Sequence, residues 1–325
     1  MRRGRQVVLA LIGAVLFIWV LAHVGVSALL QQLKAMSIAL PILLMLSICR
    51  LLLQTASWSM ALKSEGVSAT PERLIGIRMA SQAMGYLTFL GAVLSEPMKI
   101  KLLRAPTEST IKATFLDSGV YWFTSTLVAI VGCMCAALLA VHGGHYAWTA
   151  ITIALLTLVL FLIARSKPIL SGVVRILGRR SPTWLNRGEE IERSIRNCRS
   201  RQPVLVARMF WIDILCQLLM ASEVAVVVWS LRLPMHLLTV LAIEGITRAL
   251  RMVSGWVPAR LGADEGGAMS AFMAAGFSPA FGLTLALTRR MRDLLWALIG
   301  LAWLVWKAPG VMGNDKLRET YAMTR

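Results

Sequence analysis

The chain has 325 residues, of which 57% are hydrophobic and only 15% are charged, and the apolar residues fall in long continuous runs. A helix needs about 20 apolar residues to cross the roughly 30 Å hydrocarbon core of a bilayer. The composition therefore predicts an all-α polytopic membrane protein. It argues against a soluble enzyme, and against a β-barrel, whose strands would alternate apolar and polar residues.

The net charge is +18, and much of it comes from an arginine-rich segment at residues 165–203, which only Glu189, Glu190 and Glu192 oppose. Such a segment could bind nucleic acid, but an excess of Lys and Arg beside membrane spans usually fixes a loop in the cytoplasm. We therefore expect a basic cytoplasmic loop, attracted to anionic lipid headgroups, and no nucleic-acid partner.

The N-terminal sequence MRRGRQVVLALIGAVLFIWVLAHVGV is apolar from Val7 to Val26. This run exceeds the 7 to 15 residues of a signal-peptide core and has no evident cleavage site, so it is predicted to be a retained first span whose start lies inside. The basic C-terminal sequence KLRETYAMTR also favours the cytoplasm. The expected location is a bacterial cytoplasmic membrane, with both termini cytoplasmic.

No cofactor is expected from the cysteine and histidine content. The five cysteines are odd in number and lie mostly in apolar runs, so they form no disulfide framework. His142 and His145, in the sequence HGGHY, have no acidic or thiol partner nearby, which makes a turn a better interpretation than a metal site.

Hydropathy predicts about six full transmembrane helices, at residues 7–26, 38–62, 113–141, 147–164, 204–231 and 281–306. Two further apolar segments, 76–94 and 237–257, are each followed by charged sequence rich in Gly and Pro. The first has basic residues on both sides, at Lys63, Arg73, Arg78, Lys99, Lys101, Arg104 and Lys112. Both of its ends should therefore be cytoplasmic, as in a re-entrant helical hairpin. The second either re-enters or spans, and re-entry agrees with a cytoplasmic tail.

These segments predict an internal repeat within a single transmembrane domain, residues 1–325. Residues 38–141 contain a span, a hairpin at 72–104 and a span, and residues 204–306 repeat that order, with a hairpin at 236–275 and the opposite orientation. Inverted repeats that meet at broken helices build the central binding site of many transporters.

Several charged residues lie inside the second repeat. Glu244, Arg248 and Arg251 fall on one helix face, and Glu244 can pair with Arg248 four residues on. Ionisable groups at membrane depth are costly unless paired or wet, so this face is a candidate substrate pathway. The alternative is a helix near the interface whose charges reach water.

The sequence GWVPARLGADEGGAM, residues 255–269, follows that face. Its glycines allow a sharp turn, and Asp264 or Glu265 can cap the next helix. A sharper hypothesis is that one of these carboxylates pairs with an arginine of the same hairpin or of the last span and gates a polar cavity. The candidate partners on the last span are Arg289, Arg290 and Arg292. In the first hairpin, Glu96 and Lys99 occupy the comparable place.

Three more polar residues lie in predicted spans. Arg50 and Gln54 share a helix face, and Glu223 is deep enough to line a cavity. Asp213 is closer to a span end, and we expect it to reach water at the interface.

The sequence PARLGADE, followed by AAGFSPAFGLTLALTRRMRDLLWALIG, resembles the C-terminal signature of the flippase-like superfamily of lysylphosphatidylglycerol-synthase transmembrane domains. Pro258, Gly262 and Glu265 match its Pro, Gly and Glu. The first-half counterpart is LSEPMKIKLLR, which contains Glu96 and Lys99, and the chain departs from the usual pattern at Ser95 and Asp117.

The resemblance implies a lipid flippase or transporter that is not an enzyme. Its lipid would be an aminoacyl-phospholipid, a polyprenyl-linked lipid or a hopanoid, and the soluble aminoacyl-transferase domain of the synthases is not expected. The alternatives are an intramembrane lipid-modifying transferase, with Asp264 and Glu265 as acid and base, and an accessory subunit of a lipid-pathway enzyme. Expected partners are membrane lipids, with a homo-oligomer or a pathway enzyme as further options.

Overall fold

The computed structural model describes residues 36, 38–87, 91–140, 202–254 and 260–311, and every long element within them is an α-helix. The first half contains α3 (Ala39–Ser64), α4 (Pro71–Leu87), α5 (Gly91–Leu103) and α6 (Thr107–Ala140). The second half contains α10 (Pro203–Ser230), α11 (Leu237–Val253), α12 (Ala263–Ala274) and α13 (Pro279–Val311). The all-α prediction is confirmed for these ranges.

Three of the described helices, α3, α6 and α10, are long and apolar enough to cross a membrane. They correspond to the predicted spans 38–62, 113–141 and 204–231. The predicted span 281–306 forms part of α13, whose arginines distinguish it from the three apolar helices. The predicted spans 7–26 and 147–164, the termini, the HGGH sequence and nearly all of the basic loop lie outside the described residues, so the number of spans stays a prediction.

The predicted hairpins correspond to pairs of short helices. α4 and α11 have 17 residues each, whereas α5 has 13 and α12 has 12. At 1.5 Å per residue, none of the four exceeds about 26 Å, which is too short to cross roughly 30 Å of hydrocarbon. The re-entrant course of each pair in a membrane stays a prediction.

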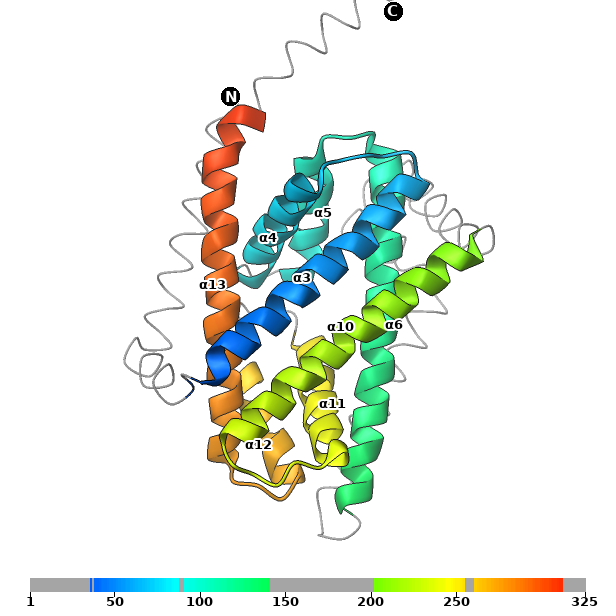
Figure 1. Ribbon diagram of the computed structural model, residues 1–325. Helices are drawn as coiled ribbons and strands as arrows, with labels where there is room; N and C mark the ends of the chain where they lie inside the picture. Colours follow the sequence, from blue (N-terminus) through cyan, green and yellow to red (C-terminus); the bar gives the residue numbers. More distant parts are fainter. Residues whose placement is uncertain (1–35, 37, 88–90, 141–201, 255–259, 312–325) are drawn as a thin grey trace, which may run out of the picture.

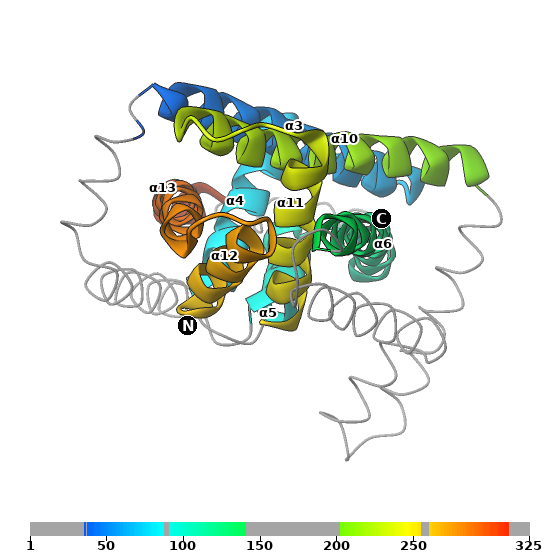
Figure 2. The same cartoon turned by 90° about the horizontal axis from the view of Figure 1, so that it is seen from below.

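The helices form two layers. α3 and α10 lie side by side in one layer, and the other helices lie beneath them (Figure 2). The pair α4–α5 lies at one end and the pair α11–α12 at the other, with the long helices α6 and α13 on either side (Figure 1). The first helix of each short pair packs against the long helix of the other half, α4 against α13 and α11 against α6. This reciprocal packing, in which each half supplies a short helix to the long helix of the other, is expected for an inverted repeat.

Glycines allow both of these crossings to be close. A Cβ at Gly132 of α6 would collide with the backbone of Gly245 in α11, and a Cβ at Gly300 of α13 would collide with the backbone of Met79 in α4. Backbone atoms cannot rotate away as side chains do, so both crossings require the missing Cβ atoms.

Gly132→Ala is therefore expected to destabilise the protein by about 1 to 3 kcal/mol, because α6 and α11 would have to separate. The matched control is Gly119→Ala on the same helix, where an added Cβ meets no atom within 4 Å and the change favours helix by up to about 1 kcal/mol. Thermal unfolding of the purified protein in detergent measures both changes. Equal unfolding midpoints for the two variants would contradict the close crossing.

Two of the basic residues from which the orientation of the first hairpin was predicted do not lie in loops. Arg78 lies inside α4 and Lys99 inside α5, and both side chains are buried. Each is paired with a carboxylate, so neither reports on the side of the membrane that its segment faces. The topological argument for this hairpin therefore depends on the more exposed basic residues, such as Lys63 and Lys101.

Candidate functional site

Glu244 of α11 lies at the centre of a buried network of charges. Its side chain is 1% exposed, and both carboxylate oxygens accept from arginines. Arg248 Nη2 donates to Oε1 at 2.5 Å, and Arg289 Nη2 of α13 donates to Oε2 at 2.5 Å. The predicted pair of Glu244 and Arg248 is confirmed. The alternative in which these charges reach water is wrong, because the packed helices bury both side chains.

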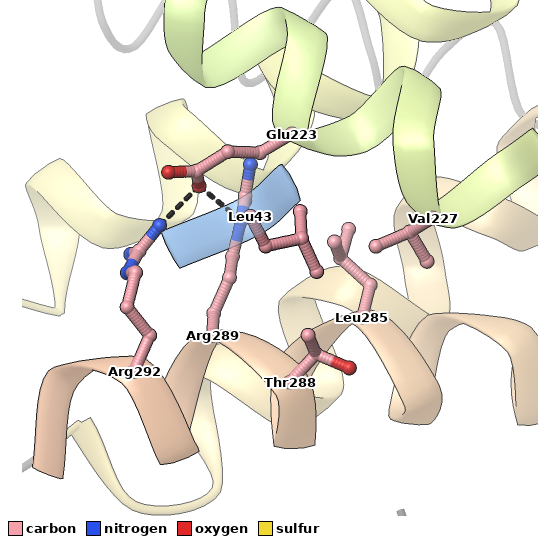
Figure 3. A pocket seen from close by; sticks show the side chains of 7 residues that line it. All are labelled: Leu43, Glu223, Val227, Leu285, Thr288, Arg289 and Arg292. Carbon is pink, nitrogen blue, oxygen red and sulfur yellow. Dashed lines mark hydrogen bonds and ion pairs between the residues drawn. The ribbon is translucent and has the colours of Figure 1, made fainter. Parts of the chain in front are cut away.

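Glu223 of α10 connects the same arginines to a second helix. Arg292 Nη1 donates to Glu223 Oε2, and Arg289 Nε lies 4.0 Å from the same oxygen. Figure 3 shows both arginines rising from α13 toward this carboxylate. Together with Leu43, Val227, Leu285 and Thr288 they line a small pocket. Glu223 is therefore a pocket residue, as its depth in the span suggested.

α3 and α6 contribute to this network as well. Arg50 Nη1 lies 3.1 Å from the sulfur of Met220, and Arg248 Nη2 lies 2.9 Å from the same sulfur. Arg248 Nη1 also donates to the hydroxyl of Tyr121 on α6 at 3.3 Å. A thioether is only a weak acceptor, so these contacts leave much of the donor capacity of Arg50 unused.

We define the central cluster as these charged residues together with Asp293, which accepts from Arg292 at 2.9 Å. It contains four arginines and three carboxylates. The members are Arg50, Arg248, Arg289, Arg292, Glu223, Glu244 and Asp293. One cation is therefore in excess in a part of the protein where an unbalanced charge is costly.

The turn between α11 and α12 contains a second group of ion pairs. Arg251 donates to both oxygens of Asp264, with Nε–Oδ1 at 3.0 Å and Nη2–Oδ2 at 3.3 Å. Arg260 Nη1 lies 3.9 Å from Asp264 Oδ2. This carboxylate thus joins the two helices of the second pair, as the hypothesis of a carboxylate paired with a hairpin arginine predicted.

Glu265 has both of the roles that the sequence left open. Its Oε2 accepts from the backbone N–H of Gly262 at 2.9 Å, which caps α12, where Gly262 has φ +78°. Its Oε1 lies 2.6 Å from Nη2 of Arg290 on α13. The cap and the ion pair with the last long helix are therefore both confirmed, whereas the gating of a cavity stays a prediction.

Arg290 is a poorly satisfied cation. Its side chain is 1% exposed, and none of its three guanidinium nitrogens makes a well-formed hydrogen bond with a described residue. The contact with Glu265, itself about one-fifth exposed, is its ion pair in the described part of the chain. A buried guanidinium normally uses several of its five donors, so Arg290 keeps capacity for an anion.

The first half contains a smaller set of charges. Lys99 Nζ donates to Glu96 at 2.9 Å within α5 and lies 5.9 Å from the ring centre of Trp58. Arg78 of α4 pairs with Asp117 of α6 at 3.2 Å and donates to the backbone oxygen of Gln54. No ion pair among the described residues joins Glu96 or Lys99 to the central cluster, so the structure does not bring the two predicted sets together.

The pairs Arg78–Asp117 and Glu244–Arg289 occupy matching positions in the two halves. Arg78 and Glu244 are each the eighth residue of their helices, α4 and α11. Asp117 and Arg289 are each the eleventh residue of theirs, α6 and α13. The two ion pairs therefore join equivalent helices with their charges exchanged, a relation that supports the proposed repeat.

One expectation from the sequence is wrong. Asp213 of α10 does not reach water at a span end: its side chain is 1% exposed and faces other helices. The sequence also contains no signal for the ion pair of Glu244 with Arg289 on α13. The same holds for the pairing of Arg78 with Asp117. Spacing along one helix finds partners on that helix only.

The described part of the chain contains no group of three or more His, Cys, Asp or Glu side chains that could hold a metal ion. Among family models, the one described as the lysylphosphatidylglycerol synthase TM region matches residues 6–301. Comparisons with curated proteins and with solved structures give no match.

Proposed function

Because the chain belongs to the family of the lysylphosphatidylglycerol synthase TM region, we propose that it moves a lipid with an anionic headgroup across or out of the cytoplasmic membrane. The family and the apolar helices make it a multi-pass membrane protein with a lipid-related function. Flippase activity, the choice of lipid and the bacterial inner membrane belong to the proposal.

The observation that carries the proposal is the excess of buried positive charge. The central cluster has four arginines against three carboxylates, and Arg290 next to it has unused donors. A phosphate or carboxylate headgroup would supply the missing negative charge and accept from several N–H groups at once. Aminoacyl-phospholipids and polyprenyl phosphates both carry a phosphate. A hopanoid would fit only if it carried an added phosphate or carboxylate group.

Ion pairs between different helices suit a site that opens and closes. Arg289 and Glu244 join α13 to α11, Arg292 and Glu223 join α13 to α10, and Arg290 and Glu265 join α13 to α12. A headgroup that competes for these arginines would release the helices from one another. Binding and movement would thus use the same contacts, without a nucleotide.

A lipid-modifying transferase is the second candidate, with Asp264 and Glu265 as acid and base. Both carboxylates are engaged by arginines, which favours a positioning or gating role over proton transfer. An accessory role beside a pathway enzyme is the third. A requirement for a nucleotide-activated donor would favour the transferase, and lipid movement by the pure protein would favour the proposal.

Glu265→Gln is the sharpest test at the hairpin turn. A glutamine oxygen can still accept from the Gly262 N–H, so the cap is retained, but Arg290 loses its counter-charge. We expect folded protein whose movement of fluorescent phosphatidylglycerol across proteoliposomes falls at least about tenfold, the equivalent of about 1.4 kcal/mol.

Asp264→Asn is the matched comparison. It removes a carboxylate that pairs with Arg251 rather than with Arg290, so it should lower the folded yield but preserve movement per folded molecule. Full activity of Glu265→Gln would show that Glu265 only caps α12. Equal losses of activity in both variants would show that the function does not depend on Glu265 specifically.

The proposal also places both termini and the segment 165–203 in the cytoplasm. A cysteine introduced at Arg196 should then be labelled by an impermeant reagent only when the membrane is opened. Labelling from the outside in intact cells would contradict this orientation.

A further inference from the structure

A second buried polar group lies between α3, α4, α6 and α10. It is centred on Asp213, whose side chain is 1% exposed and whose Oδ2 has no hydrogen-bond partner among the described residues. One turn earlier on α10, Met209 packs with Ala113 and Leu116 of α6. One turn later, Gln217 donates to Ser125 of α6 at 2.9 Å. Asp213 therefore faces α6 near Asp117.

Arg78 acts on both carboxylates of this group, but it forms its ion pair with Asp117. The charged residues that act on Asp213 are Asp117 and Arg78. Arg78 uses Nη2 for Asp117 and Nη1 for the backbone oxygen of Gln54, and its Nε is unpartnered among the described residues. No described cation lies within 4.0 Å of Asp213, so its negative charge would have no direct partner.

The other ionisable groups nearby do not compensate Asp213. On α5, Lys99 pairs with Glu96 and the two charges cancel. Arg50 of α3 contacts Met220, and Tyr121 of α6 receives a hydrogen bond from Arg248. The thiol of Cys216, on the same helix as Asp213, lies 4.0 Å from the backbone oxygen of Arg50. Of the positively charged residues, Arg78 acts on Asp213, whereas Arg50 and Lys99 do not.

We propose that Asp213 and Asp117 form a proton-binding site that couples the protein to a proton gradient. A buried carboxylate is costly when no cation contacts it and one of its oxygens accepts no hydrogen bond, whereas the same group as a carboxylic acid is neutral. Two carboxylates beside one guanidinium therefore hold one proton between them. The proton resides on Asp213, because Arg78 already compensates Asp117. The step is simple association of H⁺ with a carboxylate oxygen, and no other bond breaks.

The coupling part of this inference rests on the proposed function, whereas the proton site does not. When the proton leaves Asp213, Arg78 has two carboxylates to compensate and a spare Nε with which to reach the second. A shift of Arg78 toward Asp213 weakens the contact between α4 and α6 that Asp117 provides.

Movement of α4 is transmitted by direct packing to α13, which carries arginines of the proposed headgroup site. Gly76 of α4 lies against the ring of Trp303 on α13, and Gly300 of α13 lies against the backbone of Met79. α13 carries Arg289, Arg290 and Arg292. The buried group around Asp213 thus has a carboxylate in excess, which takes a proton, and the central cluster has an arginine in excess, which takes an anion.

Infrared difference spectroscopy of the purified protein tests the proton site directly, because a protonated carboxyl group has a carbonyl band that a carboxylate lacks. A step from alkaline to neutral pH, over which ordinary carboxylates stay ionised, should produce this band in the wild-type protein and not in Asp213→Asn. Asparagine has nearly the shape of a protonated aspartic acid, so this variant should fold. The control Glu72→Gln, on an exposed side chain of α4, should keep the band.

Asp117→Asn gives an independent check. With one carboxylate left beside Arg78, Asp213 should remain ionised, so this variant should also lack the band at neutral pH. An unchanged band in Asp213→Asn, or its persistence in Asp117→Asn, would overturn the proposed site.

Proteoliposomes with a pH difference across the membrane test the coupling. The wild-type protein should move fluorescent phosphatidylglycerol at least several-fold faster in one gradient direction than in the other, whereas Asp213→Asn should move it equally in both. Equal rates of lipid movement by the wild-type protein in the two gradient directions would refute the coupling. If the wild-type protein moves no lipid, the proposed function fails, and the infrared result still decides the proton site.

Discussion

Glu244→Gln is expected to destabilise the folded protein by about 3 to 5 kcal/mol, the largest stability change we predict. The carboxylate receives hydrogen bonds from Arg248 and Arg289, and all three side chains are buried. Removing one partner of a buried ion pair leaves the other as an uncompensated charge, and here two arginines would be left. Denaturation of the purified protein in detergent measures the loss.

Glu108→Gln is the control for this substitution. Glu108 also pairs with a cation four residues away, Lys112 at 2.7 Å, but its side chain is 74% exposed. Exposed pairs of this kind contribute about 0.3 to 0.5 kcal/mol, so the control should change little. The double variant Glu244→Gln with Arg289→Gln should lose less than the sum of the two single variants, because it removes both ends of one pair. Equal stability of Glu244→Gln and the control would contradict a buried network.

Arg290→Gln is expected to separate lipid movement from stability. The guanidinium makes no well-formed hydrogen bond with a described residue, and Glu265 keeps its contact with Gly262 when Arg290 is replaced. Stability should therefore change by less than about 1 kcal/mol, since the loss of one ion pair is offset by removal of a buried charge. Movement of an anionic lipid should fall at least about tenfold.

Arg290→Lys refines this test. Lysine keeps the charge but loses the planar set of donors that can hold two oxygens of a phosphate. It should restore part of the lost activity, and less than the wild-type level. A large loss of stability in Arg290→Gln, with lipid movement unchanged per folded molecule, would make Arg290 a structural residue.

Much of the fold could be predicted from the sequence because hydrophobic length and charge are local properties. The predicted hairpin 72–104 corresponds to α4 and α5, and the predicted hairpin 236–275 to α11 and α12. Helical spacing also placed Glu244 and Arg248 on one face of α11, where they form an ion pair. These inferences need only the geometry of a single helix.

The site was predicted less completely because it forms where four helices meet. Arg289 pairs with Glu244, which is 45 residues away in the chain, and Arg292 with Glu223, which is 69 residues away. Which residues meet depends on how the helices cross, and the glycines of α6 and α13 that set those crossings have no recognisable pattern in a single sequence. Arg78 was counted among the basic residues that flank its segment, because its partner Asp117 lies on another helix and could not be predicted from spacing.

The most direct test of the central claim is lipid movement by the purified wild-type protein in proteoliposomes without nucleotide. A membrane-impermeant quencher reports how fast a fluorescent lipid exchanges between leaflets. Phosphatidylglycerol is expected to exchange faster than in protein-free vesicles and faster than zwitterionic phosphatidylcholine, because the central cluster accepts a net negative headgroup. Exchange no faster than in empty vesicles, equal rates for the two lipids, or a strict requirement for ATP would contradict it.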